Sequence, residues 1–590
     1  MNRSAAHSSR FGILAMACLV ATGCGDAPPS ASTAPAATAV EFPPSWPWSA
    51  DIEPLRADNG VVASGALAAS EAGVAIMEQG GNAVDAAIAT HFALAVVHPT
   101  AGNIGGGGFM VVRMADGTSA ALDFRERAPL ASTPDMYLDE DGEVSRLATV
   151  GHLSVGVPGT PAGMWEAHQR FGTLDWPLLV QPAIEFAEGF TTHAFLAQSL
   201  GRAQRALSAF DASAAAFFPG GAPPAEGDTF RQPDLAETLR RIAEKGPDGF
   251  YRGRTADLLV AEMKRGGGII EHEDLQQYRA VWRDPVRFDY RGYNVISMHP
   301  PSSGGATMAE IGNILEGWEL GSMEWQSTDM IHLYAEASKR AFADRNSALA
   351  DPDFRTLPLE RMISQEYADL RRATITPDRA TPAEEVRPGL SVSDTTGHTT
   401  HYSVVDADGN AVAVTTTLNS GYGSKVTVAG TGFLLNNEMD NFAAKPGFPN
   451  QYGLVQGEAN AIEPGKRPLS SMSPSIVLDL AGDLFFVSGT PGGPTIISTV
   501  FQTISNVIDY GMNVAQAVNA PRLHHQHLPD QIYFEADGLS ADVVAQLEAL
   551  GHAVVERGGY QGDAHAIMVM PDGTLEGYSD KRRGGGVAGR

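Results

Sequence analysis

The stretch "TTHYSVVDADGNAVAVTTTLN", residues 399–419, has the pattern of two β-strands joined by a turn at Asp408-Gly409. A two-residue loop would set Ser403 opposite Val414 and would mix polar with apolar side chains on both faces. Because a half-buried sheet needs its apolar side chains on one face, this register is disfavoured.

A loop of three residues, 407–409, sorts the apolar and polar side chains onto opposite faces. It pairs Val404 with Val412 and brings Thr399 opposite Thr417 at the open end of the hairpin. We therefore predict this register, with Gly409 in the left-handed conformation.

Thr399 is a candidate nucleophile because of where it lies in the chain. A polar segment, residues 381–398, precedes it and suits an exposed, mobile stretch. A threonine hydroxyl is a weak nucleophile unless a base lies beside it. Cleavage of the bond between His398 and Thr399 would uncover an α-amino group that could be that base. The Thr417 hydroxyl could then orient the nucleophile.

A second candidate element follows the predicted strand "DLFFVSG", where "TPGGP" turns sharply into the helical pattern "TIISTVFQTISNVI". Backbone N–H groups at a helix N-terminus stabilise a developing oxyanion. Gly492 and Gly493 would let a substrate approach them without a Cβ in the way. An ordinary strand-to-helix turn explains the same segment equally well.

Other polar motifs are weaker signals when taken singly. Arg125 in "DFRERAP" could grip a carboxylate, although a structural arginine is the commoner outcome. Ser470 and Ser471 in "PLSSMSP" suit a turn or a cap. The histidines of "RLHHQHLPD" match no zinc-site spacing, so we expect no metal site.

Composition bounds the class of protein. The 590 residues are 43% hydrophobic and 19% charged, as in a soluble globular protein. A net charge of −28 argues against a nucleic-acid partner, because phosphate binding needs a basic face. Alanine-rich helices are predicted after Asp51, and strands flanked by helices predict a layered sandwich.

The N-terminus has the pattern of a secretory leader, residues 1–23, with two arginines before an apolar run. Its ending "LVATGC" resembles a bacterial lipobox, although Ala21 stands where leucine is usual. We expect lipidation at Cys24 and a periplasmic protein anchored to the outer membrane; simple secretion and an uncleaved anchor are the alternatives. Residues 24–50 are rich in Ala, Pro, Ser and Thr and predict a disordered tether.

These motifs together resemble the bacterial gamma-glutamyltransferases, a family of N-terminal-nucleophile hydrolases. The resemblance runs from about residue 55 nearly to the C-terminus, through "GGNAVDAAIA", "HPTAGNIGGGGFM", "DFRERAP", "LLNNEMDNF", "KRPLSSMSP" and "PGGP". It implies an α+β fold, a four-layer αββα sandwich, made as one precursor that cleaves itself before Thr399. The large chain would comprise residues 24–398, folded from about residue 51, and the small chain residues 399–590, the two remaining together as a heterodimer.

The resemblance also implies the activity. Thr399 would attack the γ-glutamyl amide of glutathione or a related compound and would pass the acyl group to water or to an amino acid or peptide acceptor. No cofactor is implied. Thr417 would support the nucleophile, and Gly492 and Gly493 would form the oxyanion hole.

The same resemblance distributes the remaining roles around the substrate. The substrate α-carboxylate would meet Arg125, Ser470 and Ser471, and the amino end would face Asn419, Glu438 and Asn441. Tyr452 in "KPGFPNQYGLV" resembles the gate of a lid loop.

One departure from the family pattern concerns Asn441, which stands where an aspartate is usual. An amide carries no charge, so the preference for a substrate ammonium should weaken unless Glu438 restores it. With this asparagine the chain resembles relatives that act as glutaryl or cephalosporin acylases. A glutaryl or cephalosporin acylase is therefore the second functional hypothesis. A lipid-tethered binding protein that has kept the fold without activity is the third.

Overall fold

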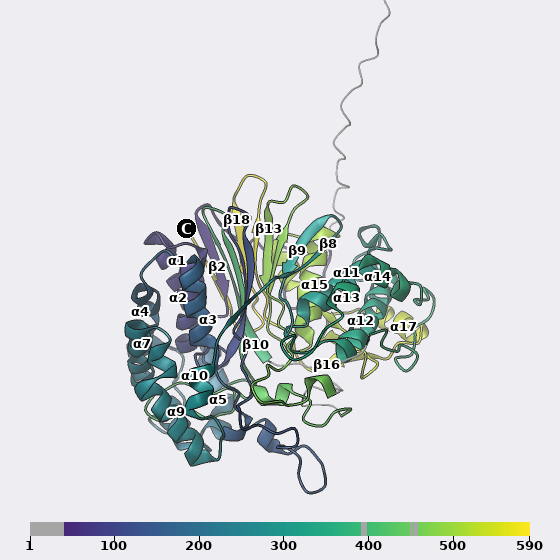
Figure 1. Cartoon of the computed structure of the whole chain (residues 1–590). Coiled ribbons are helices and arrows are strands. Elements are labelled where there is room, and N and C mark those ends of the chain that lie inside the picture. The colour runs from purple at the N-terminus through teal and green to yellow at the C-terminus, as the bar shows by residue number, and fades with distance from the viewer. Residues whose placement is uncertain (1–39, 391–397, 449–450, 452–457) are drawn as a thin grey trace, which may run out of the picture. The chain divides into compact units, whose positions relative to one another are not determined.

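The computed structural model places two seven-stranded antiparallel sheets face to face between two layers of helices (Figure 1). The structure describes residues 40–390, 398–448, 451 and 458–590. The four layers confirm the predicted αββα sandwich.

The first sheet contains the predicted hairpin at its centre. Strands β10 and β11 are flanked by β2 on one side and β3 on the other. In spatial order its strands are β19 (Gly586–Gly589), β2 (Gly60–Ser64), β10 (His398–Asp406), β11 (Ala411–Asn419), β3 (Gly107–Arg113), β4 (Ser119–Asp123) and β7 (Val281–Arg283).

The second sheet packs against the first through β13 and β17, which contact β10. In spatial order its strands are β1 (Leu55–Ala57), β18 (Leu575–Ser579), β17 (His565–Val569), β13 (Leu484–Gly489), β12 (Ser475–Leu478), β9 (Tyr293–Ser297) and β8 (Val286–Tyr290). Strands from before and after the predicted cleavage position interleave in both sheets, which would keep two chains together after such a cleavage.

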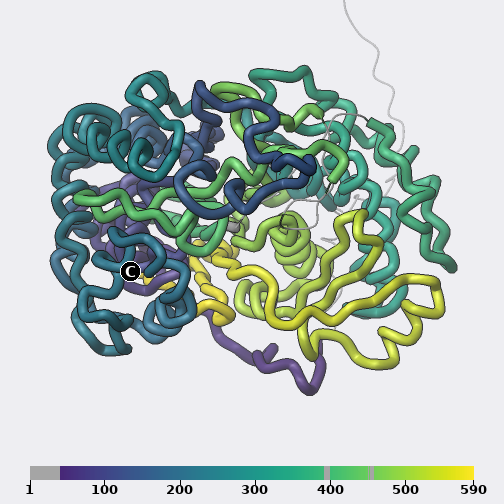
Figure 2. The backbone as a smooth tube through the Cα atoms, turned by 90° about the horizontal axis from the view of Figure 1, so that it is seen from below, coloured from purple at the N-terminus to yellow at the C-terminus, as the bar shows by residue number. Residues whose placement is uncertain are grey.

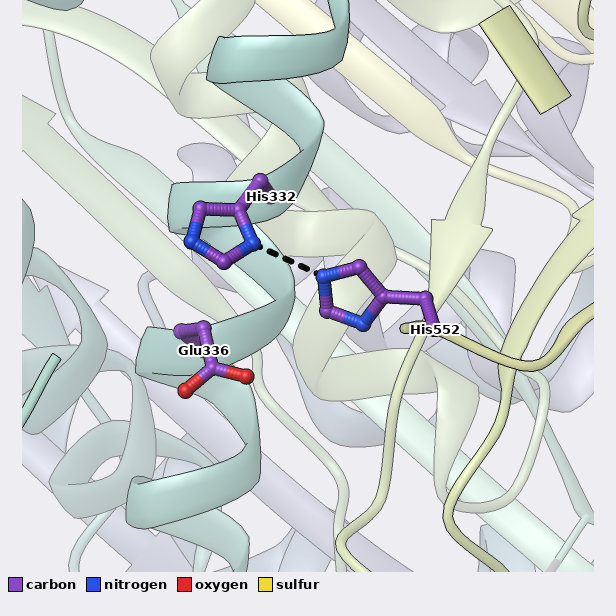
Figure 3. A group of neighbouring side chains, drawn as sticks. All are labelled: His332, Glu336 and His552. Atoms are coloured by element: carbon purple, nitrogen blue, oxygen red, sulfur yellow. Dashed lines mark hydrogen bonds between the residues drawn. The ribbon is translucent and has the colours of Figure 1, made fainter. Parts of the chain in front are cut away.

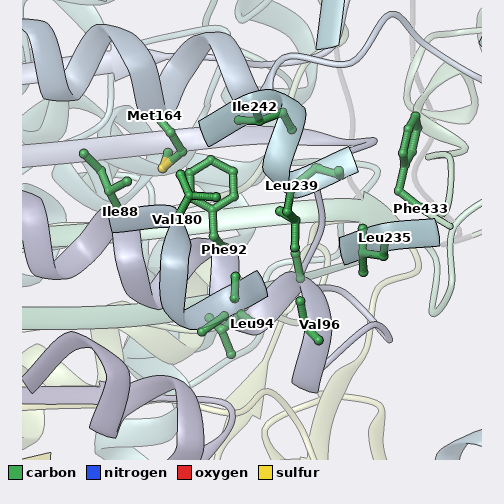
Figure 4. Packing of buried hydrophobic residues seen from close by; sticks show 14 of the residues in the cluster. Ile88, Phe92, Leu94, Val96, Met164, Val180, Leu235, Leu239, Ile242 and Phe433 are labelled. Carbon is green, nitrogen blue, oxygen red and sulfur yellow. The ribbon is translucent and has the colours of Figure 1, made fainter. Parts of the chain in front are cut away.

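One helical layer covers the outer face of the hairpin sheet. The predicted alanine-rich helices are α1 (Leu67–Glu78) and α2 (Ala83–Val97), and α2 is buried along its whole length. Small side chains allow this close approach, and Figure 4 shows Phe92 and Ile88 of α2 packed among side chains of later helices. The remaining helices of the layer are α3 (Thr160–Phe171), α4 (Trp176–Glu188), α5 (Ala194–Leu207), α6 (Asp211–Phe217), α7 (Pro233–Lys245), α8 (Asp248–Tyr251), α9 (Gly253–Gly266) and α10 (His272–Gln277).

The other helical layer covers the second sheet. It comprises α11 (Gly304–Leu315), α12 (Thr328–Ala348), α13 (Leu359–Met362), α14 (Gln365–Arg372), α15 (Thr495–Ile508), α16 (Val514–Asn519) and α17 (Ala541–Ala549). Beside it lies a small sheet of β14 (Leu523–His524), β15 (Ile532–Glu535) and β16 (Val554–Arg557), and β5 (Phe190–Thr191) pairs with β6 (Thr229–Phe230) elsewhere. None of the described helices is long and apolar enough to cross a membrane.

The hairpin register is the predicted one over most of its length, with Val404 opposite Val412. Gly409 has the expected positive φ of 82°. The end of the hairpin differs, because the register shifts between His398 and Thr400 and His398 pairs with Asn419. Between these two pairs β11 has two residues, Thr417 and Leu418, where β10 has only Thr399. The extra residue of this β-bulge therefore lies in β11 and faces Thr399, and bulges commonly re-aim a side chain beside an active site.

The assumption of a half-buried hairpin was wrong. Val404 and Val412 pack into the helix-covered core, whereas Val405, Ala411 and Ala413 pack into the core between the sheets. The polar side chains of that inner face are buried as well: His401 bonds to the hydroxyls of Thr415 and Ser403, at 2.9 and 3.0 Å.

The predicted tether extends too far. Residues 40–50 pack on the folded domain because they carry aromatic residues: Trp46 is buried and donates to the Asn519 carbonyl at 2.9 Å. Trp48 stacks edge-on against Tyr560, and the Arg582 guanidinium lies over both tryptophan rings. Figure 2 shows this purple segment beside the yellow C-terminal region. Residues 1–39, with Cys24, lie outside the described part of the chain.

The polar segment before Thr399 is also more ordered than predicted. The Ala383 N–H donates to Asp530 at 2.7 Å, and the Gly389 N–H donates to Asp344 at 2.6 Å. Backbone bonds to the half-buried Asp530 and the buried Asp344 thus anchor residues 381–390, whereas residues 391–397 lie outside the described residues. The three strands β7 to β9 lie between the helices α10 and α11.

Candidate active site

Thr399 lies near the start of β10 and is 3% exposed. The bulge around it follows from the shift of pairing between His398 and Thr400. The predicted scissile bond therefore joins two residues at the very end of the central hairpin, where the ladder is already irregular.

Thr417 and Asn419 lie at the matching end of β11. The Asn419 N–H donates to the Thr417 hydroxyl at 2.7 Å, and the Thr417 side chain lies near enough to the Glu438 carboxylate to lower its pKa, against the larger effect of burial. Asn419 adopts a positive φ of 71°, and its Nδ2 donates to the Asn437 carbonyl at 2.7 Å. Asparagine tolerates this left-handed conformation better than most residues, which lets the strand end here.

The short helix Glu438–Asn441 brings the next candidates against this strand end. Glu438 forms a buried ion pair with Arg125 at 2.9 Å, and the Asn441 amide donates to the same carboxylate. Arg125 also donates to the carbonyls of Pro468 and Leu469, at 3.2 and 3.4 Å. The structure therefore joins Arg125, Glu438, Asn441 and the segment before Ser470 in one site.

Two carboxyl groups, those of Glu126 and Glu438, lie beside this guanidinium, and a third, Asp440, follows on the same short helix as Glu438. Burial raises the pKa of Glu126 well above its usual range, and the Glu438 charge adds to this effect. Burial also raises the pKa of Glu438, with Arg125 opposing the change. Asp440, which is 6% exposed, has its pKa raised to about 7 by burial. The resemblance did not single out Glu126 or Asp440. In the sequence, only their positions directly next to Arg125 and Asn441 could have indicated that they belong to the site.

The two predicted serines are buried but differ in their partners. The Ser471 hydroxyl accepts a hydrogen bond from Arg345 of α12 at 3.0 Å. Ser470 bonds through its backbone to Pro301 and Ser303, and its hydroxyl accepts from the Met472 N–H at 3.2 Å. Arg345 is thus a second arginine at this wall, which the sequence pattern did not reveal because it comes from a distant helix.

The predicted oxyanion segment forms the expected sharp turn between β13 and α15. Gly492 and Gly493 have φ values of 144° and 64°, which favour glycine. β13 approaches the hairpin closely just before this turn: a Cβ on Gly489 would lie 2.3 Å from the His401 ring, two residues after Thr399. The turn therefore emerges beside the strand that carries the candidate nucleophile.

Asn103 is a positioning residue that the sequence reasoning missed. Its Nδ2 donates to the Thr416 hydroxyl and the Thr417 carbonyl, at 3.1 and 2.9 Å. Its Oδ1 accepts from Gly106 and Thr160. The motif "HPTAGNIGGGGFM" thus serves as a brace for the end of β11, and its glycines allow β3 to lie close to the hairpin: a Cβ on Gly106 would meet the Thr417 carbonyl at 2.0 Å.

The histidines of "RLHHQHLPD" do not converge on one point. Their rings bond to separate groups, which are the Ser498 hydroxyl for His524, the Asp530 carboxylate for His525, and the Ala383 and Val386 carbonyls for His527.

Among the described residues, one other group has metal-ligand chemistry, and it comprises His332, Glu336 and His552 (Figure 3). His332 bonds to His552 at 2.8 Å through one ring nitrogen and to the Thr376 carbonyl through the other. Glu336 is already paired with Lys339 and Arg340, at 3.2 and 2.6 Å. A metal ion here would face two cationic side chains, so these contacts fit a structural network better than a metal site.

The family model for gamma-glutamyltranspeptidase matches residues 69–590. The chain belongs to the gamma-glutamyltranspeptidase family. The glutathione hydrolase proenzyme of Escherichia coli strain K12 is 48% identical over 553 residues, which cover 92% of this chain and 95% of that protein.

Acylases are also similar to the chain. The acylase ACY 1 proenzyme of Pseudomonas sp. strain SE83 is 40% identical over 542 residues, covering 90% of this chain and 94% of that protein. The crystal structure of cephalosporin acylase from Bacillus halodurans matches with a TM-score of 0.82 at 31% identity, covering 93% of this chain and 99% of that one. The family and fold predicted from the sequence are thereby confirmed.

Tyr452, the predicted gate, lies outside the described residues. Several of the other predicted site residues lie close to one another. Arg125, Thr417, Asn419, Glu438 and Asn441 form one connected network, and Ser471 joins the neighbouring wall through Arg345. Gly492 and Gly493 approach from the facing sheet.

Proposed function

We propose that this protein is a self-processing enzyme that cleaves its own chain before Thr399 and then cleaves γ-glutamyl amides such as glutathione. The observation that carries the proposal is the position of Thr399, which is buried opposite a bulge in β11, the strand whose end leads directly to the Arg125–Glu438 pair. Relatives named glutathione hydrolase proenzyme support it.

The chemistry follows from the uncovered amine. The α-amino group of Thr399 takes the hydroxyl proton, and Oγ1 attacks the γ-carbonyl carbon. The carbon–nitrogen bond of the amide breaks, and the amine leaves with that proton. Water or the amine of an amino acid or peptide then attacks the ester carbon, and the oxygen of Thr399 regains a proton. The N–H groups near Gly492 and Gly493 would stabilise the oxyanion in both steps.

Arg125 and Glu438 suit the amino-acid end of a γ-glutamyl group. A guanidinium complements the α-carboxylate bidentately, and a neighbouring carboxylate complements the ammonium. The two side chains pair with each other at 2.9 Å, so they present opposite charges at the spacing of a zwitterion. The α-carboxylate of the substrate would pair with Arg125 and its ammonium with Glu438, in place of the contact between these two side chains.

The experiment compares the wild type with Thr399→Ala on a denaturing gel and with two anilides. The wild type should give two chains and release nitroaniline from γ-glutamyl-p-nitroanilide, whereas Thr399→Ala should remain one chain without turnover. An intact wild-type chain with full activity would refute the proposal.

A glutaryl or cephalosporin acylase is the second candidate, favoured by the uncharged Asn441 and by the two acylase relatives. Its substrates lack the ammonium. Glutaryl-p-nitroanilide assayed in parallel separates the two functions, because a strong preference for the glutaryl anilide would select the acylase. Failure to turn over either anilide, with one unprocessed band, would select an inactive binding protein.

We also propose export and lipidation at Cys24, on the leader pattern of residues 1–23. A lipid anchor would place the enzyme on the outer membrane, facing the periplasm. Radiolabelled palmitate should enter the wild type but not Cys24→Ser. Equal labelling of both proteins, or none, would refute the anchor.

A further inference from the structure

The turn between β13 and α15, which contains Gly492 and Gly493, is held by two threonine hydroxyls. The Thr490 hydroxyl donates to the Pro491 carbonyl at 2.9 Å. The Thr495 hydroxyl donates to the Gly492 carbonyl at 2.8 Å. Both threonines are at most 3% exposed, so little water competes for these bonds. Each hydroxyl therefore fixes one carbonyl group of the turn.

A fixed carbonyl group also fixes the N–H group of the next residue. The peptide unit is planar, and in its trans form the C=O and the N–H point to opposite sides. The bonds from Pro491 to Gly492 and from Gly492 to Gly493 are both trans. The Thr490 hydroxyl thus directs the Gly492 N–H away from itself. The Thr495 hydroxyl does the same for the Gly493 N–H.

These two N–H groups are available to a substrate. Among the residues that the structure describes, no oxygen accepts a hydrogen bond from either of them. Gly492 is partly exposed, whereas the other members of residues 490–495 are buried. Backbone N–H groups in a protein interior are nearly always paired, so two unpaired ones in succession indicate that a ligand supplies the acceptor.

The two hydroxyls occupy space that larger residues would fill. The Thr490 hydroxyl oxygen accepts from the Asp563 N–H at 2.9 Å. Gly562 allows this contact, because a Cβ at that position would lie 2.7 Å from the same oxygen. Gly492 serves the other threonine in this way, since its Cβ would lie 2.4 Å from the Thr495 hydroxyl. A second segment of the chain therefore holds Thr490 in place.

We infer that Thr490 and Thr495 are positioning residues that orient the N–H groups of Gly492 and Gly493 toward the oxyanion of the reaction. This inference rests on the proposed function and adds the side chains on which its oxyanion hole depends. Glycine is the least restricted residue, so two successive glycines do not by themselves define where their N–H groups point. The two hydroxyls supply that missing restriction.

Orientation decides how much an oxyanion donor contributes. Loss of one donor lowers kcat about 10²- to 10³-fold in enzymes that use such a site. A donor that remains but can rotate should cost less, about tenfold to 50-fold. The loss should fall on the tetrahedral state and spare the binding of the substrate, because only the tetrahedral state carries the negative oxygen.

The test uses the processed enzyme and a boronic acid analogue of the γ-glutamyl group, in which boron replaces the γ-carbonyl carbon. Boron bonds to the Thr399 oxygen while the α-amino group takes the hydroxyl proton, so the adduct is tetrahedral and negatively charged. Its inhibition constant, Ki, therefore reports interactions that are made only in the tetrahedral state. L-glutamate forms no such adduct, so its Ki reports ground-state binding.

Thr490→Val and Thr495→Val keep the shape of the side chain and remove the hydroxyl. Each should raise the Ki of the boronic acid and lower kcat for γ-glutamyl-p-nitroanilide, both by about tenfold to 50-fold. The Ki of L-glutamate should change less than about twofold. Thr490→Ser and Thr495→Ser retain the hydroxyl and should stay within about threefold of the wild type in all three measurements.

Thr503→Val is the matched control on α15. Thr503 is also buried, and its hydroxyl donates to the carbonyls of Thr499 and Val500, at 2.7 and 2.9 Å. It lies about two helical turns after Thr495 and so does not touch the turn. Its loss should change kcat and both inhibition constants less than about twofold.

A valine variant that folds but stays one chain is tested by its rate of self-cleavage. Attack of Thr399 on the His398 carbonyl also forms an oxyanion, so the matching serine variant should process at nearly the wild-type rate. Thr490→Ala or Thr495→Ala replaces a valine variant that does not fold.

The outcomes separate this inference from the proposed function. Wild-type affinity for the boronic acid in either valine variant would overturn the role of that threonine. Equal losses of affinity for the boronic acid and for L-glutamate would do the same. Failure of the proposed function shows in the wild type itself, which would then stay one continuous chain or leave γ-glutamyl-p-nitroanilide uncleaved.

Discussion

The Arg125 guanidinium lies 2.9 Å from the Glu438 carboxylate, although cleavage before Thr399 would place the two residues on different chains. Both side chains are at most 1% exposed. Under the proposed function, the ion pair would join the large and small chains inside the site, and substrate recognition would require both of them.

Arg125→Lys tests this relationship first. A lysine keeps the charge but loses the planar fork that binds a carboxylate bidentately, so kcat/KM for γ-glutamyl-p-nitroanilide should fall about 100-fold, mainly through KM. Arg240→Lys on the exposed face of α7 is the control and should change the value less than twofold. A small effect of Arg125→Lys would show that the pair is structural.

Asn103→Ala tests the brace at the end of β11. The change removes donors to Thr416 and Thr417 and leaves buried groups without partners, which should cost about 2–4 kcal/mol of unfolding free energy. Processing should slow because Thr417 loses its fixed position. Time courses of band conversion on a gel and thermal unfolding measure the two effects; unchanged processing with lowered stability would limit Asn103 to a structural role.

Asp440→Asn should change the stability of the folded protein in a way that depends on pH. The pKa of Asp440 is raised from 3.8 to about 7 in the folded state. The folded state therefore holds this proton between those pH values while the unfolded state loses it, and stability falls as the pH rises through this window, by about 4 kcal/mol at most. Asp440→Asn should raise the melting temperature at pH 8 and leave it nearly unchanged at pH 4. A melting temperature that does not rise at pH 8 would mean that the buried charge is already compensated.

Trp46→Ala tests the docking of the N-terminal segment. Trp46 is buried and bonded to the Asn519 carbonyl, so truncation should cost about 3 kcal/mol of stability. Deletion of residues 24–39, which precede the packed segment, should cost almost nothing in comparison. Thermal unfolding of both variants checks this; equal melting temperatures would restore the longer tether predicted from composition.

The hairpin register could be predicted because valines recur at every second position and because Asp-Gly is typical of a hairpin turn. It could not predict the bulge at Thr399, since a one-residue shift at a strand end leaves no mark in the pattern. The period-2 argument also assumed one solvated face, whereas tertiary packing buries both faces. The packing of Trp46 and Trp48 was not predicted, because the proline- and alanine-rich residues before them indicate a disordered tether. Strands β7 to β9 were not predicted, because helical patterns lie on either side of them.

The site was predicted mainly from motifs. This prediction was incomplete where the contacts come from segments that are distant in the sequence. Arg345 of α12 donates to the Ser471 hydroxyl, and the sequence around neither residue predicts this contact. Asp440 was not singled out beside Asn441, because its raised pKa comes from burial, which the residue type alone does not reveal. The roles of Thr399, Gly492 and Gly493 remain predictions that the experiments above address.

The most direct test of the central claim is the mass and N-terminal sequence of the small chain after reaction with a γ-glutamyl substrate and rapid acid quenching. The account predicts a chain that begins at Thr399 and carries the added mass of one γ-glutamyl group on that residue. An enzyme that turns over γ-glutamyl amides while its chain remains continuous through Thr399, or whose acyl group resides elsewhere, would contradict it.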